Sequence, residues 1–215
     1  MPDEHLIDAR THGRYLCEVP PSTGPWPILM GFHGYAEDAE IHLEALRSIP
    51  GADAWLLVAV QALHPFYTRQ QRVVASWMTR HDREHAIADN TDYVGRVIRA
   101  VQSQYGTRRP TVFAGFSQGG AMAYRAAAAF PCDGVLVLAA DVPPDVAAAG
   151  RTLPRVLLGR GTRDQWYTEE QHDRDAAALT GHAIAVESCV FDGAHEWGAP
   201  FLVAAGEWLA RTKVQ

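Results

Sequence analysis

Residues 112–120 read Val-Phe-Ala-Gly-Phe-Ser-Gln-Gly-Gly, an apolar run that ends in a serine with a glycine two positions away on each side. The residues before Ser117 favour a buried strand, and the alanine-rich stretch 118–130 favours a helix. A tight turn between strand and helix leaves room only for glycine, which lacks Cβ, at Gly115 and Gly119. This setting of Gly-x-Ser-x-Gly is typical of a nucleophile elbow, which lifts the serine hydroxyl above a sheet edge. The stretch predicts acyl transfer through a serine ester.

Apolar runs and helical patterns alternate along the rest of the chain. Apolar runs predict strands at 15–19, 28–33, 54–60, 110–114, 134–140, 155–159 and 183–191. Helices are predicted at 37–47, 93–105 with a start at Asp89 or Asn90, 118–130, 168–179 and 199–211, and a long loop at 61–88. Strands buried on both faces and separated by helices form a mostly parallel sheet with helices on both sides. The predicted fold class is therefore α/β.

Length, composition and charge narrow the class of protein further. The 215 residues suit a single domain over 1–215, and 47% hydrophobic with 20% charged residues is ordinary for a soluble globular protein. A net charge of −6 provides no basic surface for nucleic acid. We expect no membrane insertion, because no run approaches the roughly 18 apolar residues of a span. Cys17, Cys132 and Cys189 are widely spaced in apolar surroundings, which favours reduced, buried thiols and a cytoplasmic location.

A serine hydroxyl is a weak nucleophile at neutral pH and needs a base that a third group orients. With this motif the chain order is serine, acid, histidine. Three histidines follow Ser117. His195 comes directly after the last predicted strand, whereas His172 and His182 lie in or beside a polar helix. Because open parallel sheets bind ligands at the carboxyl ends of their strands, His195 is the predicted base.

Two aspartates compete for the role of the acid. Asp164 lies in a glycine-bounded loop on the strand immediately before the histidine, so we favour it. Asp141 follows the preceding strand and remains the alternative. Asp192 is too close in sequence to His195 to reach its ring easily, and we expect it to shape the loop through Asx-type hydrogen bonds.

Acyl transfer also requires backbone donors aimed at the developing oxyanion. One donor is the amide of Gln118, the residue after the nucleophile. The second is expected from the loop that begins in residues 31–35, Gly-Phe-His-Gly-Tyr, where the histidine-glycine pair directs the amide of Tyr35 toward the elbow. His33 is expected to support this loop and to take no part in proton transfer.

Other residues are also expected to border the site. Trp77 and Trp166 lie in loops and either line a substrate pocket or pack those loops onto the domain. Asp141 is included among the candidate pocket residues. His81 and His85 have a spacing that can bind metal on a helix, but no third ligand is near. We therefore expect no metal and no cofactor.

Four blocks of the chain resemble the phospholipase/carboxylesterase family of α/β-hydrolases, which includes the acyl-protein thioesterases. These blocks are Phe-His-Gly-Tyr at 32–35, Gly-Phe-Ser-Gln-Gly-Gly at 115–120, Gly-Thr-Arg-Asp at 161–164 and Gly-Ala-His-Glu-Trp at 193–197. The resemblance covers about residues 28–209. Tyr35 stands where family members usually have leucine, and Trp77 is followed by Met-Thr in place of an aromatic residue and aspartate.

The resemblance implies a compact α/β-hydrolase without a separate lid domain, with the triad Ser117, Asp164 and His195. It also implies an oxyanion hole made by the amides of Tyr35 and Gln118. The expected reaction is hydrolysis of a small-molecule carboxylic ester, with short-chain soluble esters preferred. The alternatives are a thioesterase or small-acyl peptidase with the same triad, and a non-catalytic binding protein with the hydrolase shape. Whether the protein is a monomer or a homodimer stays open.

Overall fold

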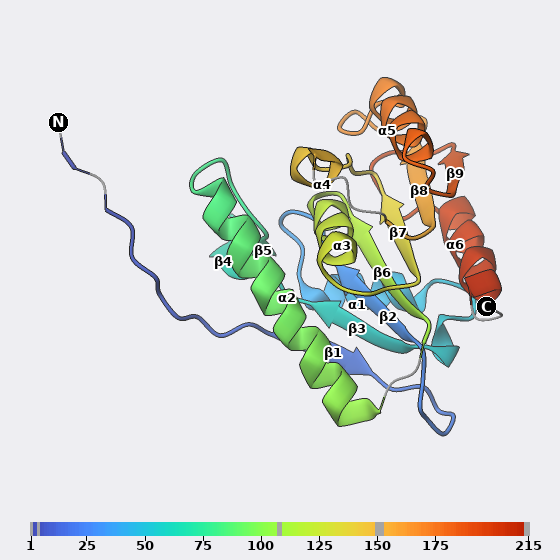
Figure 1. Ribbon diagram of the computed structural model, residues 1–215, viewed down its shortest axis with the longest axis horizontal. Coiled ribbons are helices and arrows are strands. Elements are labelled where there is room, and N and C mark those ends of the chain that lie inside the picture. The colour runs from blue at the N-terminus through green and yellow to red at the C-terminus, as the bar shows by residue number, and fades with distance from the viewer. Residues whose placement is uncertain (1, 4, 107–108, 149–152, 213–215) are drawn as a thin grey trace.

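A central sheet with helices on both faces organises the protein (Figure 1). The computed structural model describes residues 2–3, 5–106, 109–148 and 153–212. The strands are β1 (Tyr15–Glu18), β2 (Ile28–Phe32), β3 (Leu56–Val60), β4 (His64–Tyr67), β5 (Val73–Ser76), β6 (Thr111–Phe116), β7 (Gly134–Leu138), β8 (Val156–Gly161) and β9 (Val186–Phe191). The helices are α1 (Ala39–Arg47), α2 (Arg83–Tyr105), α3 (Gln118–Ala129), α4 (Pro144–Ala148), α5 (Glu169–Gly181) and α6 (Ala199–Thr212), with a 3₁₀ turn at Ala52–Ala54.

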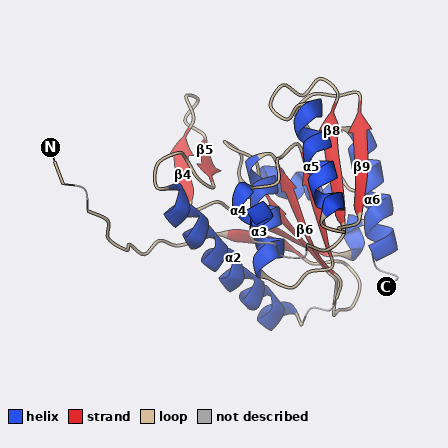
Figure 2. Ribbon diagram, turned by 45° about the horizontal axis from the view of Figure 1, so that its top comes forward, coloured by secondary structure: helices blue, strands red, loops and turns tan. Residues whose placement is uncertain are grey.

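The side of the sheet on which the chain adds successive strands changes at β2, in the centre of the sheet. Among the described residues, seven strands run in the order β1-β3-β2-β6-β7-β8-β9, and only the β1–β3 pair is antiparallel. The chain passes from β2 to β3 on one side, then crosses back to β6 on the other side of β2. Right-handed crossovers in opposite directions place α1 on one face and α2, α3 and α5 on the other (Figures 1 and 2). Ligands bind at such a reversal, beyond the carboxyl ends of the strands.

The inner strands form the core. Every residue of β2, β3, β6, β7 and β8 is buried, which confirms the expectation of strands covered on both faces. In the edge strand β9 only the last residue, Phe191, is buried, and the other residues are exposed or partly buried. The predicted α/β class is confirmed. A rigid core under the carboxyl ends of β2 and β6 holds the loops that follow them in fixed positions.

The predicted loop 61–88 is wrong in two respects. It contains the hairpin β4–β5, whose turn is closed by hydrogen bonds between Thr68 and Arg72, and β4 is too exposed to show an apolar alternation. It also contains the start of α2, at Arg83 rather than at Asp89 or Asn90. The first turns of α2 are polar and so lack the apolar spacing of the later turns.

Three smaller features also depart from the prediction. The short helix α4 was not predicted, and β9 begins at Val186 rather than at residue 183. The three cysteines are free but only partly buried, so the expectation of fully buried thiols is corrected. Burial raises the pKa of all three thiols, and that of Cys132 to about 12, which keeps them protonated at neutral pH.

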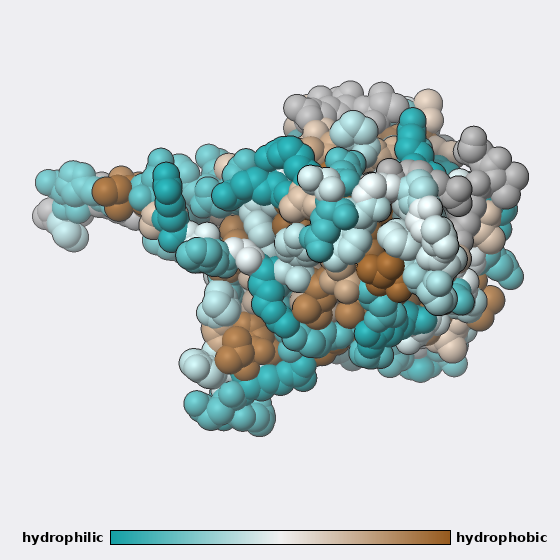
Figure 3. All heavy atoms as spheres, turned by 90° about the horizontal axis from the view of Figure 1, so that it is seen from below, coloured by the Kyte–Doolittle hydropathy of each residue, from teal (hydrophilic) through white to brown (hydrophobic). Residues whose placement is uncertain are grey.

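The surface is predominantly hydrophilic on the face seen in Figure 3, where apolar side chains form small separate patches. The segment before β1 extends away from the body of the protein (Figures 1 and 3). None of the described helices is both long and apolar enough to cross a lipid bilayer.

Candidate active site

Ser117 occupies a strained turn between β6 and α3. Its backbone has φ 52° and ψ −124°, a left-handed conformation that costs a non-glycine residue about 1–3 kcal/mol. Two hydrogen bonds hold the turn: the Ser117 amide donates to the carbonyl of Leu138 at 2.9 Å, and the Gly120 amide donates to the carbonyl of Ser117 at 2.9 Å. The predicted strand-turn-helix around the serine is therefore present.

The glycines on either side of Ser117 are required by close approaches of the backbone. A Cβ on Gly115 would lie 2.3 Å from the carbonyl oxygen of Gly119, and a Cβ on Gly119 would lie 1.9 Å from the carbonyl oxygen of Phe32. Both obstacles are backbone atoms, which cannot rotate away. The second contact also shows that α3 begins directly against the end of β2, at the reversal point of the sheet.

We expect Gly119→Ala to destabilise the fold by at least about 3 kcal/mol, because its Cβ overlaps backbone that belongs to the core strand β2. Urea unfolding followed by circular dichroism measures this change. The control is Gly181→Ala at the end of α5, where a Cβ meets nothing within 4 Å, and where alanine should be neutral or slightly stabilising. Equal stability of the two variants would contradict the steric argument.

His195 and Asp164 form a hydrogen-bonded pair. His195 Nδ1 lies 2.8 Å from Asp164 Oδ2, while the other oxygen, Oδ1, accepts from the amides of Trp166 at 2.8 Å and Tyr167 at 3.0 Å. The carboxylate of Asp164 is fully buried, and the histidine side chain is 22% exposed. An ionised carboxylate with three donors keeps the proton on Nδ1 and leaves Nε2 as the nitrogen that can accept a proton.

The pair forms because the two loops continue the pairing of β8 with β9. The Thr162 amide donates to the carbonyl of Phe191, and the Arg163 amide donates to the carbonyl of Gly193, both at 2.8 Å. Arg163 also forms an ion pair with Asp192, at the exposed surface. Asp192 was expected to shape its loop through Asx-type bonds, and the structure instead shows it tying the two loops together.

The other candidate acid, Asp141, lies elsewhere in the site. Its Oδ1 accepts from Gln171 Nε2 at 3.0 Å and from Arg174 at 3.2 Å, both on α5. Asp141 lines the pocket that contains Ser117, as expected for a pocket residue. Of the two aspartates, the structure brings Asp164 to His195.

The loop after β2 is held by the side chains of His33, which is buried, and Glu37, which is partly buried. His33 Nε2 accepts from the amide of Ala62 at 3.0 Å, and Nδ1–H donates to the carbonyl of Gly34 at 2.7 Å. Burial lowers the pKa of His33, so the imidazole is neutral and both nitrogens are engaged with the backbone. Glu37 Oε2 accepts from the amide of Gly34 at 2.7 Å. The amide of Gly34 is thus occupied, and the next amide, that of Tyr35, is the expected donor to an oxyanion.

The side chain of Gln118 has a role that sequence reasoning missed. Its Oε1 accepts from the Trp77 amide at 2.8 Å and from Ser76 Oγ at 3.2 Å, and its Nε2 donates to the carbonyl of Met78 at 2.8 Å. These bonds fasten the segment after β5 to the first residue of α3. The sequence indicates this connection only through the presence of a polar side chain next to Ser117, because the partners of that side chain lie about 40 residues away in the sequence.

Trp77 does not line the pocket, which corrects that part of the prediction. Its side chain is completely buried, packs on Phe32 and His33, and donates from Nε1 to the carbonyl of His33 at 2.8 Å. Trp77 therefore packs a loop onto the core, the second of the two roles expected for it. Trp166, by contrast, is 79% exposed and stands at the rim of the pocket. Tyr35 is exposed as well, and its ring stacks on Phe66 of β4.

Ser117 and His195 line one open pocket of about 370 Å³. The remaining residues that line it are Arg83, Gln118, Ala121, Ala139, Ala140, Asp141, Pro143, Pro144, Trp166 and Tyr167. The ring of Phe116 lies 4.9 Å from that of His195 and packs the imidazole from the side. The pocket lies at the reversal point of the sheet, where the topology predicts a ligand.

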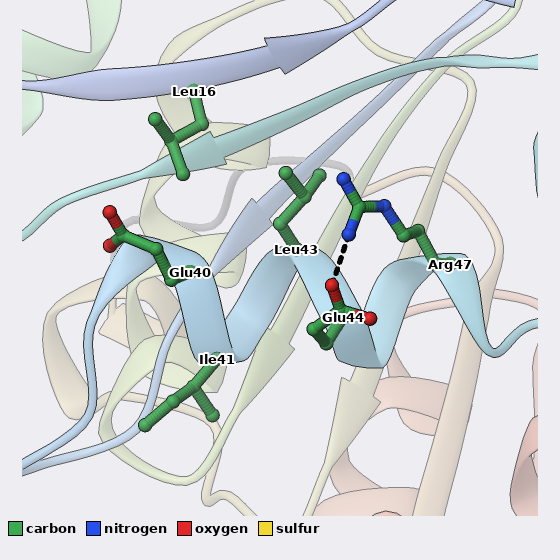
Figure 4. Close-up of a pocket in the computed structure, with 6 residues that line it drawn as sticks. All are labelled: Leu16, Glu40, Ile41, Leu43, Glu44 and Arg47. Atoms are coloured by element: carbon green, nitrogen blue, oxygen red, sulfur yellow. Dashed lines mark hydrogen bonds and ion pairs between the residues drawn. The ribbon is translucent and has the colours of Figure 1, made fainter.

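A second hollow lies between α1 and β1 (Figure 4). Its charged groups are satisfied, because Glu40 pairs with Arg14 and Glu44 pairs with Arg47. It holds no candidate nucleophile. Within the described residues, no group of three histidine, cysteine or acidic side chains is placed to hold a metal ion. His81 instead contacts Asp82 at 2.9 Å.

An elbow serine at the carboxyl edge of a mostly parallel sheet, beside a histidine–carboxylate pair, defines the α/β-hydrolase fold. The sequence model of the phospholipase/carboxylesterase family matches residues 32–198. The chain belongs to this family and is a hydrolase of the esterase class.

Solved structures share the fold at low sequence identity. A carboxylesterase from Bacillus cereus aligns with a TM-score of 0.75 and 15% identity over 93% of this chain and 94% of that one. A Mesorhizobium loti carboxylesterase aligns with a TM-score of 0.70 and 20% identity, over 86% and 88% of the two chains. Acyl-protein thioesterase 2 from Zea mays aligns with a TM-score of 0.70 and 15% identity, over 94% and 99%. No curated protein sequence matches the chain.

Proposed function

We propose that the protein hydrolyses short-chain carboxylic esters through an acyl-enzyme intermediate on Ser117. In this proposal His195 is the general base and Asp164 orients it. The observation that carries the proposal is the 2.8 Å contact between His195 Nδ1 and the buried Asp164 carboxylate, in the pocket that Ser117 also lines.

In the first step, Ser117 Oγ attacks the ester carbonyl carbon while its proton passes to His195 Nε2. The amides of Gln118 and Tyr35 donate to the oxyanion of the tetrahedral intermediate. The carbon–oxygen bond of the ester then breaks, and the alcohol leaves with the proton from His195. Water attacks the acyl-serine by the same route, which releases the carboxylic acid and restores the Ser117 hydroxyl. Asp164 stays ionised and stabilises the imidazolium that forms in each step.

The size of the pocket supports a short substrate. About 370 Å³ is near the lower end of small-molecule sites, which run from roughly 300 to 1,000 Å³. Small side chains such as Ala121, Ala139 and Ala140 line it, and they offer contact to a short aliphatic segment but not to a long chain.

We therefore expect kcat/KM for p-nitrophenyl acetate or butyrate to exceed that for p-nitrophenyl palmitate at least about 10-fold, since each methylene without apolar contact gains little transition-state binding. Initial rates of p-nitrophenolate release, below the micelle concentration of the palmitate ester, measure this. The Ser117→Ala variant provides the background rate for each ester. A preference for palmitate would contradict the short-chain proposal but leave the triad intact.

Thioester hydrolysis is the second candidate, favoured by the structural likeness to the maize acyl-protein thioesterase over 94% of this chain. The same serine and amide donors would act on a thioester carbonyl. Rates for ethyl butyrate and the butyryl thioester of N-acetylcysteamine separate the two activities. A hydrolysis rate for the thioester far above that for the oxygen ester, after the non-enzymatic rate of each has been subtracted, would favour the second candidate.

A further inference from the structure

Arg83 is the one strongly basic side chain among the described residues that line the pocket with Ser117 and His195. It is the first residue of α2, and its side chain is exposed at the pocket. No function described above uses it. Ligand sites commonly hold a few placed polar or charged groups that orient the ligand, and Arg83 is such a group in this lining.

Two acidic groups near Arg83, Asp145 and Asp141, are paired with other arginines, and the adjacent Asp82 pairs with His81. Asp145 accepts from Arg125 through both carboxylate oxygens, each at 2.8 Å. The pKa of Asp145 is lowered chiefly by that bond to Arg125, and only in small part by the charge of Arg83. Asp141, the other acid of the pocket, is bound to Arg174 and Gln171 as described above. Within the described part of the chain, no carboxylate lies within 4.0 Å of the Arg83 guanidinium.

One part of the lining is suited to an aliphatic segment. Ala121, Ala139, Ala140, Pro143 and Pro144 have no side-chain hydrogen-bonding groups, and the indole of Trp166 stands exposed beside them. A substrate whose ester carbonyl reaches Ser117 would lay its non-reacting part across these residues. A carboxylate on that part could then meet Arg83, whose planar guanidinium matches the two oxygens of a carboxylate.

We propose that Arg83 binds a carboxylate on the non-reacting half of the substrate, so that the preferred esters are carboxylate-bearing monoesters. This inference rests on the proposed ester hydrolysis. The aliphatic spacer between the ester and the carboxylate would lie on the alanine and proline surface, and the ion pair would form at the exposed end of the pocket. Arg83 acts in binding and takes no part in bond making.

The test compares matched substrates that differ in charge. Monomethyl adipate carries a carboxylate on the acyl side, and methyl 6-oxoheptanoate is its neutral counterpart, with a methyl in place of one oxygen. The pair 5-acetoxypentanoate and 6-acetoxyhexan-2-one places the same difference on the alcohol side. Methyl 6-aminohexanoate carries a cation. Titration of the released acid at constant neutral pH and low ionic strength provides kcat/KM for each.

We expect the wild-type protein to prefer the carboxylate over its neutral counterpart at least about 5-fold in one series, a size typical of a partly exposed charge-assisted bond. In Arg83→Gln the ratio of kcat/KM for the carboxylate ester to that for its neutral counterpart should fall to about one, mainly through a higher KM for the carboxylate ester. Arg83→Glu should prefer the ammonium ester over the carboxylate ester. Added salt should also lower the wild-type ratio. The matched control is Arg99→Gln, which removes the same charge from an exposed site on α2 outside the pocket and should keep the wild-type ratio.

The possible outcomes separate this inference from the proposed function. Hydrolysis of the neutral esters with no carboxylate preference in either series, or with a preference that Arg83→Gln retains, overturns the role of Arg83 and leaves the esterase proposal standing. Hydrolysis of none of the esters or thioesters overturns the proposed function. Equal urea midpoints for wild type, Arg83→Gln and Arg99→Gln show that a lost preference arises at the site rather than from unfolding.

Discussion

Ser117→Ala should abolish turnover of p-nitrophenyl butyrate, with a loss in kcat of about 10⁵-fold or more. The alanine keeps the small side chain that the strained turn accommodates but has no oxygen to form the acyl-enzyme. The residual rate should come only from the amide donors and from binding, which accelerate attack by free water weakly. Stopped-flow or steady-state release of p-nitrophenolate measures the difference.

A fluorophosphonate probe provides an independent measurement, because it labels only a serine that a neighbouring base activates. We expect stoichiometric labelling of the wild-type protein and none of Ser117→Ala. Ser103→Ala, at an exposed position on α2, controls for the loss of a serine and should label like wild type. A wild-type protein that neither labels nor hydrolyses esters would be the non-catalytic hydrolase-like protein of the alternative hypothesis.

Asp164→Asn should lower kcat by about 10⁴-fold while leaving the fold intact, the size expected when the histidine is held in the wrong tautomer. The geometry specifies how this arises. The amides of Trp166 and Tyr167 both donate to Oδ1, so the asparagine should place its oxygen there and turn its NH₂ group toward His195 Nδ1. Nδ1 would then accept a hydrogen bond, the proton would move to Nε2, and His195 could no longer take the proton from Ser117.

The comparison variant is Asp141→Asn, which should lower kcat by less than about 10-fold, because the Asp141 carboxylate contacts Gln171 and Arg174 rather than His195. Rates across the pH range from mildly acidic to alkaline, with fluorophosphonate labelling as a second measure, distinguish the two variants. The assignment of the acid would be wrong if Asp141→Asn lost activity and Asp164→Asn kept it.

Secondary structure could be predicted wherever local sequence carried the information. The mainly apolar strands β2, β3, β6 and β7 lie close to their predicted positions, and α2 ends at Tyr105, directly before Gly106, whose left-handed φ of 55° suits glycine. The hairpin β4–β5 could not be predicted, because it depends on the loop after β2. The amide of Ala36 in that loop donates to the carbonyl of Ala75 at 3.1 Å, and the amide of Ala75 donates to the carbonyl of Glu37 at 2.8 Å. The early start of α2 likewise depends on distant packing, as Asn90 donates to the carbonyl of Trp77 at 2.7 Å.

The sequence alone was enough to determine the elbow and the α/β fold class, since both depend on steric and apolar patterns within a few residues of the chain. It also narrowed the catalytic acid to two aspartates at strand ends. Only the tertiary structure brought Asp164 rather than Asp141 to His195, buried Trp77, joined Gln118 to the segment after β5, and placed Arg83 in the lining of the pocket that contains Ser117. These contacts link residues about 30 to 45 positions apart, and their geometry follows from how strands and helices pack rather than from any local pattern.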